Sequence, residues 1–163
     1  MEAARVFPAS IVPLVVALSI SAGANRAAAQ EDPHFGTWRL NVAKSTFDPG
    51  PPLKSQTRWY EWYQGGVRAR VETIDAKLHR TIGGYIAYFD GRDYPSTDDP
   101  DVITIALRRV GHFTIEGTLK RGGVVVLTTR NVVSGDGSAM TLTEKGIGAD
   151  GRPFTNVQVY DKQ

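Results

Sequence analysis

Apolar and polar residues alternate along most of the chain that follows Gly36. The alternation is clearest in the segments VRARVETI (67–74), GYIAYFD (84–90), VITIALRR (102–109) and HFTIEGTLK (112–120). A period of two places successive side chains on opposite faces and is typical of strands with one buried face. No stretch of comparable length carries the apolar stripe of an amphipathic helix. The pattern therefore predicts an all-β protein.

Glycine-rich turn signals separate these strands at short intervals. They read QGG (64–66), DGR (90–92), VGH (110–112), RGG (121–123), GDG (135–137) and ADGR (149–152). Glycine supplies the positive φ that tight hairpin turns need, so each strand is expected to turn back beside the one before it. The result is an antiparallel meander of about nine or ten strands, which usually closes into an up-and-down β-barrel and removes its open edges. A β-sandwich is the alternative, because alternation alone does not show closure.

The first strand carries a tryptophan and then runs into a bend rich in Pro and Gly. In GTWRLNV the residues Trp38, Leu40 and Val42 share one face, so we expect Trp38 to lie against the floor of the barrel. The segment FDPGPPL (47–53) then crosses to the next strand. The alternative is an ordinary core Trp followed by a loop whose prolines lower the entropy of the unfolded chain.

Residues 1–29 have the features of a secretory signal peptide. An apolar run follows Arg5, and Ala27 and Ala29 occupy the −3 and −1 positions of a cleavage site in RAAAQ. A membrane anchor is the alternative, but the uninterrupted stretch IVPLVVALSI (11–20) is shorter than the ~20 residues that span a bilayer. We therefore predict cleavage after Ala29, one domain over 30–163, and a protein that is exported, either periplasmic or secreted.

Charge and cysteine content exclude several classes of function. Removal of 1–29 lowers the basic count from 19 to 17 and the acidic count from 17 to 16, which leaves a net charge of +1. This near neutrality gives no electrostatic basis for binding nucleic acid. The chain has no Cys, so it is neither a disulfide scaffold nor a lipid-modified lipoprotein, and it has no thiolate for catalysis.

Three motifs carry a resemblance to known families. FGTWRLN (35–41) resembles the Gly-x-Trp opening of lipocalins and intracellular fatty-acid-binding proteins, and NVQVYDKQ (156–163) resembles the R-x-Tyr-Glu-Lys ending of the latter. With FDGRDYP (89–95) in the middle, the chain looks still more like a group of small exported bacterial lipocalin-like proteins. The resemblance implies an up-and-down barrel with an internal cavity for a small apolar molecule.

Two departures from the fatty-acid-binding pattern matter. The connection 44–54 is too short and too rich in Pro for the two helices that form a lid in that family. By position, Gln158 replaces the Arg of the closing motif, whereas Tyr160 is kept. The resemblance implies that the Arg and Tyr of this ending clamp the carboxylate of a ligand, whereas the neutral amide of Gln158 cannot neutralise a carboxylate. We therefore expect a ligand with a neutral polar head. The competing interpretation buries Val157 and Val159 and turns Gln158 and Tyr160 outward.

No metal or catalytic motif stands out. The three His residues, at 34, 79 and 112, share no ligand spacing, and the acidic run DGRDYPSTDDPD (90–101) lacks the order of ligands in an EF-hand, so it is interpreted as a solvated loop. No Ser or Thr sits in a nucleophile elbow. A lumenal carboxylate such as Glu61 or Glu72 is the one route to acid–base chemistry that the pattern leaves open. We therefore assign no catalytic residue, metal or cofactor.

The segment RWYEWY (58–63) carries aromatic residues on both faces of a strand. Trp59, Glu61 and Tyr63 face one way and the other three residues face the opposite way, so one set lines the lumen and the other lies outside. The outer set either packs near Phe47 under the first loop or forms a patch for contact with protein or glycan.

The sequence thus favours a monomeric binding protein that holds a small hydrophobic molecule in its lumen. The ligand-binding candidates are Trp38, Trp59, Tyr63, Phe89, Gln158 and Tyr160. Two alternatives stay open: a barrel-type isomerase or cyclase acting on an apolar substrate, and a structural or inhibitory envelope protein whose lumen is filled by side chains.

Overall fold

A computed structural model describes residues 32–148 and 150–163 of the 163-residue chain. The predicted signal peptide, 1–29, lies outside the described residues. Within the described part, ten strands and no helix are present. The strands are β1 (Gly36–Asp48), β2 (Ser55–Tyr63), β3 (Gly66–Ile74), β4 (Arg80–Ala87), β5 (Asp90–Pro95), β6 (Ile103–Gly111), β7 (Thr114–Arg121), β8 (Val124–Val133), β9 (Ala139–Ile147) and β10 (Pro153–Lys162).

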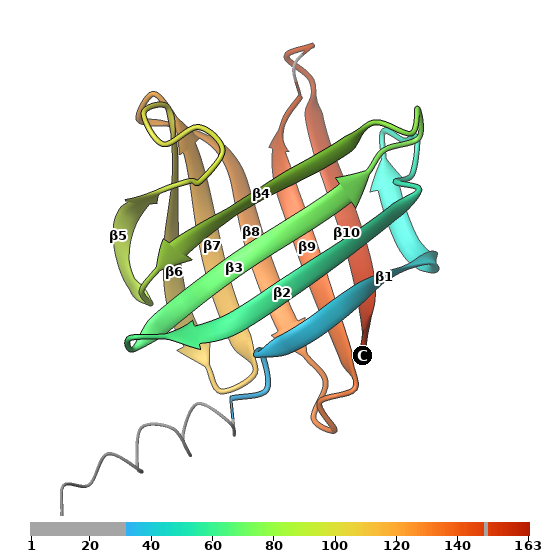
Figure 1. The fold of residues 1–163 in the computed structure, drawn as a ribbon. Coiled ribbons are helices and arrows are strands. Elements are labelled where there is room, and N and C mark those ends of the chain that lie inside the picture. Colours follow the sequence, from blue (N-terminus) through green and yellow to red (C-terminus); the bar gives the residue numbers. More distant parts are fainter. Residues whose placement is uncertain (1–31, 149) are drawn as a thin grey trace, which may run out of the picture.

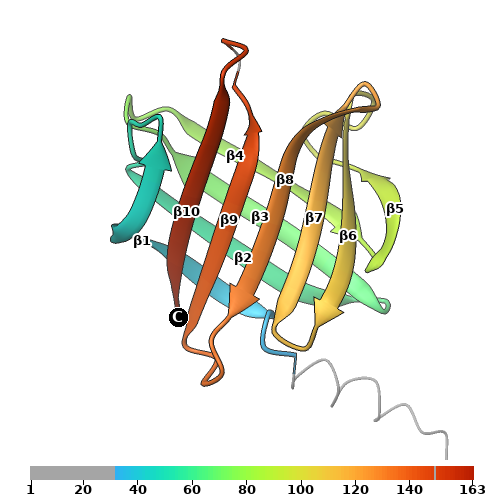
Figure 2. The same ribbon diagram turned by 180° about the vertical axis from the view of Figure 1, so that it is seen from behind.

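The ten strands form one antiparallel sheet in the order β4-β3-β2-β1-β10-β9-β8-β7-β6-β5. Except for β4 and β5, each strand pairs with its neighbour in the sequence, and β1 also pairs with β10. The half formed by β1 to β4 crosses over the half formed by β6 to β10 (Figure 1), and the view from behind shows the same two layers in reverse order (Figure 2). The predicted up-and-down β-barrel is therefore confirmed.

The two edge strands, β4 and β5, close the barrel through a few contacts rather than a full ladder. Tyr85 forms an isolated antiparallel bridge with Ser96, just after β5. The next backbone N–H, that of Thr97, donates to the carbonyl of Gly84 over 2.8 Å. On its other side, Gly84 packs tightly against β3: a Cβ on Gly84 would lie 2.2 Å from the carbonyl oxygen of Ala69. The close approach of β3 and β4 at this point therefore requires glycine.

The loops divide the barrel into two ends. The connections 49–54, 75–79 and 96–102 lie at what we call the open end, at the top of Figure 1, and the turns at 64–65 and 112–113 lie at the closed end. The segment 49–54 holds no helix, so the barrel has no helical lid over this connection, as the sequence predicts.

The closed end holds the best-packed part of the core. Trp38 is fully buried there, together with Met140 and Tyr160, and its indole N–H donates to the carbonyl of His34 over 2.9 Å. The expectation that Trp38 lies against the floor of the barrel is confirmed. The large ring fills the space where the first strand enters the sheet, and its one polar atom is satisfied by the residues just before that strand.

One predicted turn is wrong. The segment DGR at 90–92 was expected to form a hairpin, but the chain turns earlier, at Tyr88 and Phe89, and Asp90 already belongs to β5. Gly91 has a φ of +78° and lies where the register between β5 and β6 shifts. The Asp-Gly pair thus forms part of a β-bulge here, because a bulge of this kind needs the same positive φ as a tight turn.

We expect Trp38→Ala to lower the free energy of unfolding by about 3–5 kcal/mol, the usual cost of deleting a large buried aromatic side chain. Trp62→Ala is the matched control: Trp62 is 44% exposed on the neighbouring strand, and its loss should cost less than about 1 kcal/mol. Denaturation by guanidinium chloride measures both. Equal losses in the two variants would mean that Trp38 does not hold the floor of the barrel.

Candidate functional site

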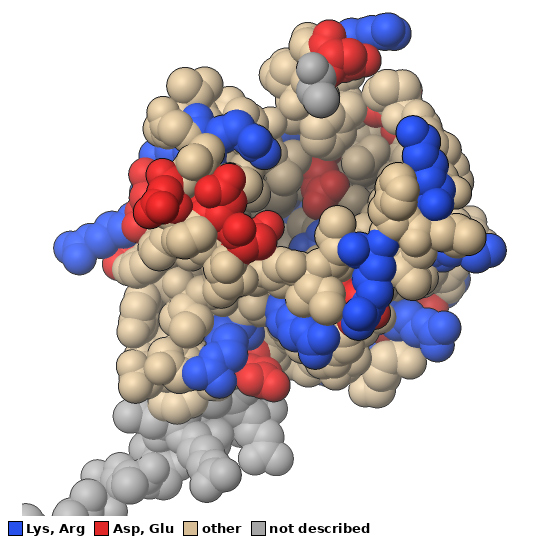
Figure 3. Space-filling model, turned by 45° about the horizontal axis from the view of Figure 1, so that its top comes forward, with Lys and Arg blue, Asp and Glu red and all other residues tan. Residues whose placement is uncertain are grey.

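A cavity of about 320 Å³ lies inside the barrel. Its walls are mostly apolar and come from β3 and from β6 to β9, with aliphatic residues at Val67, Val71, Ile103, Ile105, Leu107, Ile115, Leu119, Leu127 and Leu142. Ile82 on the edge strand β4 also lines it and is 46% exposed, so the cavity reaches the surface beside that edge. Figure 3 shows the hollow at the open end, with charged side chains inside it.

Arg58 on β2 projects into this cavity. On β2 the even-numbered residues Gln56, Arg58 and Tyr60 point inward, which is opposite to the face that carries Trp59. The guanidinium donates from Nε to the hydroxyl of Tyr160 and to Oε1 of Gln56, each over 2.9 Å, and from Nη1 to the hydroxyl of Tyr60 over 3.3 Å. Three inward side chains therefore hold one cation in place.

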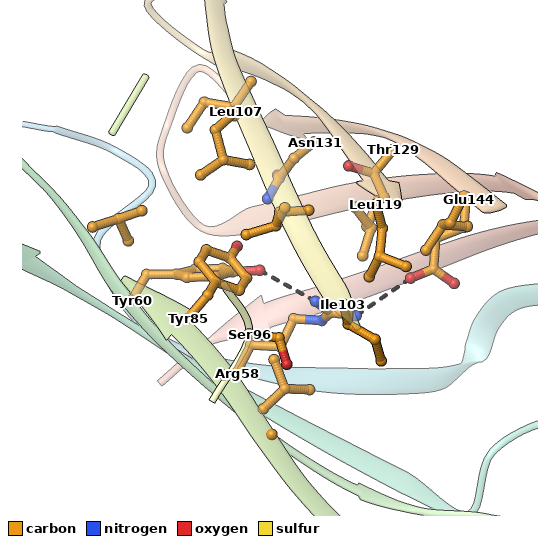
Figure 4. A pocket seen from close by; sticks show the side chains of 18 of the residues that line it. Arg58, Tyr60, Tyr85, Ser96, Ile103, Leu107, Leu119, Thr129, Asn131 and Glu144 are labelled. Carbon is orange, nitrogen blue, oxygen red and sulfur yellow. Dashed lines mark hydrogen bonds and ion pairs between the residues drawn. The ribbon is translucent and has the colours of Figure 1, made fainter. Parts of the chain in front are cut away.

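Glu144 on β9 supplies the matching negative charge. Its Oε1 lies 3.4 Å from Nη2 of Arg58, and the two side chains are only 14% and 12% exposed. Its Oε2 accepts from the amide of Gln158 over 2.7 Å. Figure 4 shows Arg58 between Tyr60 on one side and Glu144 on the other. The Arg58–Glu144 pair places two charges in the interior, and its net charge is zero.

The ionisation of these groups follows from their surroundings. Burial disfavours the charged form of Arg58, but Tyr160, Tyr60 and Glu144 outweigh it and hold the pKa of Arg58 well above its ordinary value. Burial also raises the pKa of Tyr85 and of Tyr160 far above the usual value for a phenol. Both hydroxyls are therefore neutral at physiological pH and keep their protons for hydrogen bonds.

Gln158 and Tyr160 lie inward, as the sequence argument about the closing motif requires. They are 2% and 0% exposed, whereas Val157 and Val159 are only partly buried, so the competing interpretation of β10 is wrong. The hydroxyl of Tyr160 lies within hydrogen-bond distance of Oε1 of both Gln56 and Gln158, and its single proton donates to one of them at a time. Neither Gln158 nor Tyr160 lines the cavity: they stand behind Arg58 and Glu144 and orient them.

The other predicted residues are dispersed. Phe89 lines the cavity, with its ring 4.6 Å from the guanidinium of Arg109. Trp38 lies under the cavity rather than in its wall. The lumenal positions expected for Trp59 and Tyr63 are wrong, because β2 turns Arg58 and Tyr60 inward instead. The rings of Trp59 and Tyr63 stack with Arg70 and Arg68 at 4.7 and 4.2 Å.

Sequence reasoning missed the charged pair. Arg58 belongs to the RWYEWY segment, but an arginine is ordinarily expected on the solvent face of a strand. The inward position of Glu144 could have been found in the sequence, because it shares one strand face with Met140 and Leu142 in MTLTE (140–144). The carboxylates that the sequence did suggest lie outside: Glu61 is 65% exposed, and Glu72 pairs with Arg80 over 2.9 Å.

No group of His, Cys, Asp or Glu with the geometry of a metal site occurs among residues 32–148 and 150–163. In the acidic run, Asp98 lines the cavity and hydrogen-bonds to Ser96, while Asp90 and Asp93 contact Tyr94 and Lys120. Within the same described residues, no helix has the length and hydropathy to cross a membrane.

Comparisons with solved structures include a likeness in fold. The barrel is similar to the crystal structure of zebrafish ileal bile acid-binding protein complexed with cholic acid, with a TM-score of 0.48 and 11% sequence identity. The alignment covers 80% of this chain and 99% of that one. No family model matches the chain, and no curated protein matches it. The fold and the cavity are therefore established from this chain's own strands and side chains.

We expect Tyr160→Phe to lower the free energy of unfolding by about 1–3 kcal/mol, because Arg58 and two glutamines each lose a partner for a buried polar group. Tyr63→Phe is the matched control, since that ring stacks on Arg68 on the outer face, and it should change stability by no more than about 0.5 kcal/mol. Thermal and urea unfolding measure both. A neutral result for Tyr160→Phe would show that the cluster does not depend on this hydroxyl.

Proposed function

We propose that this protein is an exported binding protein that holds one small, mostly apolar molecule with a neutral polar head inside its barrel, without chemical turnover. The observation that carries the proposal is a cavity inside the barrel, open at one end, with aliphatic walls and one charge-compensated polar cluster. Ligand sites in proteins commonly combine such walls with a few placed polar groups. Export rests on the sequence of residues 1–29 alone.

The volume limits the size of the ligand. A cavity of about 320 Å³ is at the lower end of the range for sites that enclose drug-sized molecules, so it suits one compact hydrophobic molecule rather than a pair of long lipids. Burial of apolar ligand surface against these walls supplies most of the affinity, at roughly 25 cal/mol per Å².

The Arg58–Glu144 pair supports a neutral head. A free arginine in such a cavity would attract a carboxylate, but the charge of Arg58 is already balanced by Glu144. A ligand carboxylate would add a second negative charge beside Glu144 and would leave it uncompensated in an apolar cavity, which is strongly disfavoured. An alcohol, ketone or ester avoids this cost and can still accept a hydrogen bond from Arg58 or Tyr60.

Both alternatives from the sequence lose support. The isomerase or cyclase hypothesis needs a lumenal carboxylate such as Glu61 or Glu72, and both lie on the outer face. The carboxylate that does lie in the lumen, Glu144, is paired with Arg58. The structural or inhibitory hypothesis needs a lumen filled by side chains, whereas the lumen holds a cavity. The outer aromatic residues Trp59 and Tyr63 are engaged by Arg70 and Arg68.

Replacement of the buried carboxylate tests the proposal. We expect the native protein to bind a saturated fatty alcohol more tightly than the fatty acid of the same chain length, at a pH where the acid is ionised. Glu144→Gln keeps the size of the side chain but removes its charge, so Arg58 becomes free to pair with the ligand. The preference should then shift toward the acid by about 10-fold or more, the range of one charge-assisted hydrogen bond.

Glu116→Gln is the matched control, because Glu116 pairs with Arg130 on the outer surface over 2.6 Å and lies away from the cavity. Calorimetry on delipidated protein gives the dissociation constants, and circular dichroism verifies that each variant is folded. Tighter binding of the acid by the native protein would rule out the neutral head. Failure of both probes to bind would contradict the binding function itself.

A further inference from the structure

The Phe and Tyr side chains that line the cavity all come from the half of the barrel that β1 to β4 form. Tyr60 lies on β2 and Tyr85 on β4, Phe89 lies in the turn after β4, and Phe35 directly precedes β1. The residues of β6 to β9 that line the cavity are aliphatic or polar instead. Because the two halves cross over each other, the cavity has an aromatic side and an aliphatic side.

Tyr60 and Tyr85 flank one small residue. Both pair in register with Ala69 on β3, so the three side chains share the inward face of adjacent strands. Ala69 contributes only a methyl group between the two rings. Burial raises the pKa of Tyr85, and Tyr60 raises it further, which places the two hydroxyl groups close enough to interact. Figure 4 shows both tyrosines on one side of the cavity and Leu107, Leu119 and Thr129 on the other.

The ring of Phe89 is held in place from behind. The guanidinium of Arg109 lies over this ring, 4.6 Å from its centroid, and Arg109 is itself paired with Asp32. A cation over a ring occupies one of its two faces. Since Phe89 still lines the cavity, the rest of its ring is available to a bound molecule.

Arg58 adds a cation beside these rings. Its hydrogen-bond partners lie at all three nitrogens: Tyr160 and Gln56 at Nε, Tyr60 at Nη1 and Glu144 at Nη2. Hydrogen bonds of a guanidinium lie near its plane, so these partners do not occupy its faces. A guanidinium attracts the face of an aromatic ring, and the attraction is stronger where water is excluded. A saturated molecule gains nothing from this cation.

The shape of the cavity also favours rings over a flexible chain. A volume of about 320 Å³ holds one compact molecule. An alkyl chain folded into such a space loses its torsional freedom on binding, whereas fused rings have little of this freedom to lose. For the same buried apolar area, a rigid ring compound therefore binds with a smaller entropic cost.

We propose that the ligand is a planar, unsaturated ring compound whose rings pack against Tyr60, Tyr85 and Phe89 and whose neutral polar group, such as a phenolic hydroxyl or a ring carbonyl, lies beside Arg58. Aromatic rings attract one another beyond the area that they bury, through offset or edge-to-face contacts. This inference rests on the proposed function, since it names the class of molecule that occupies the same cavity.

The test compares naphthol with its fully hydrogenated analogue, decahydronaphthol, which has the same carbon skeleton and hydroxyl but no π system. Calorimetry on delipidated mature protein at neutral pH, where both probes are uncharged, gives the two dissociation constants. In the native protein we expect naphthol to bind at least about 3-fold more tightly, which lies in the range of one aromatic pair.

Three variants test whether the aromatic side causes this preference. Tyr85→Leu and Phe89→Leu each remove one ring, and each should lower the preference for naphthol by about 3-fold or more. Tyr85→Phe keeps the ring and removes only the hydroxyl, so the preference should stay as in the native protein. Tyr63→Leu is the matched control, because the ring of Tyr63 stacks on Arg68 on the outer face. Circular dichroism verifies that each variant is folded.

The outcomes separate this inference from the binding function. If decahydronaphthol binds as tightly as naphthol or more tightly, or if both leucine variants keep the native preference, the aromatic ligand class is overturned. It is also overturned if a fatty alcohol binds but neither ring compound does, and the binding function then stands. If the fatty alcohol and both ring compounds fail to bind, the binding function fails and the ligand class fails with it.

Discussion

The buried guanidinium of Arg58 is the constraint on which the interior of this barrel depends. A cation that is 12% exposed is stable only if charge and hydrogen bonds compensate its lost hydration, and here Glu144, Tyr160, Tyr60 and Gln56 do so. These partners come from β2, β9 and β10, which lie close together in the sheet with only β1 between β2 and β10. The polar cluster therefore ties the second strand of the chain to the last two.

The need to keep Arg58 and Glu144 paired also limits how far the side chains of the core can close the cavity. A core of aliphatic residues alone could collapse around any void, but Arg58 and Glu144 must keep the geometry that satisfies them. Gln158 and Tyr160 stand behind the pair and fix it from the β10 side. The aliphatic residues of β6 to β8 face the cluster across the cavity, and no side chain of theirs can take the place of a hydrogen-bond partner.

The sequence predicts the strands well, because apolar and polar residues alternate along a half-buried strand. Val67, Ala69 and Ile105 all face inward as the alternation requires. The pattern does not tell which face is inward when both faces carry large residues. On β2 this ambiguity assigned Trp59 to the lumen in place of Arg58.

The failure on β2 and the success on β10 have one physical cause. The usual rule puts charged and amide side chains in water, and the rule fails only where a partner from a distant strand satisfies them. Glu144 is 86 residues from Arg58 along the chain. No local window contains both, so Arg58 cannot be recognised as buried from its own strand, whereas Gln158 is placed inward only by the resemblance of the closing motif.

The tryptophan of the first strand links the floor of the barrel to the site above it. Trp38 is fully buried, so its indole N–H needs an acceptor, and the carbonyl of His34 is that acceptor. The hydrogen bond holds the segment before β1 across the closed end, where the imidazole of His34 contacts Asp32. His34 lines the cavity from a position before the first strand, and the hydrogen bond from Trp38 fixes it there. The short Gly-x-Trp opening therefore closes the barrel and also holds one residue of the cavity wall in place.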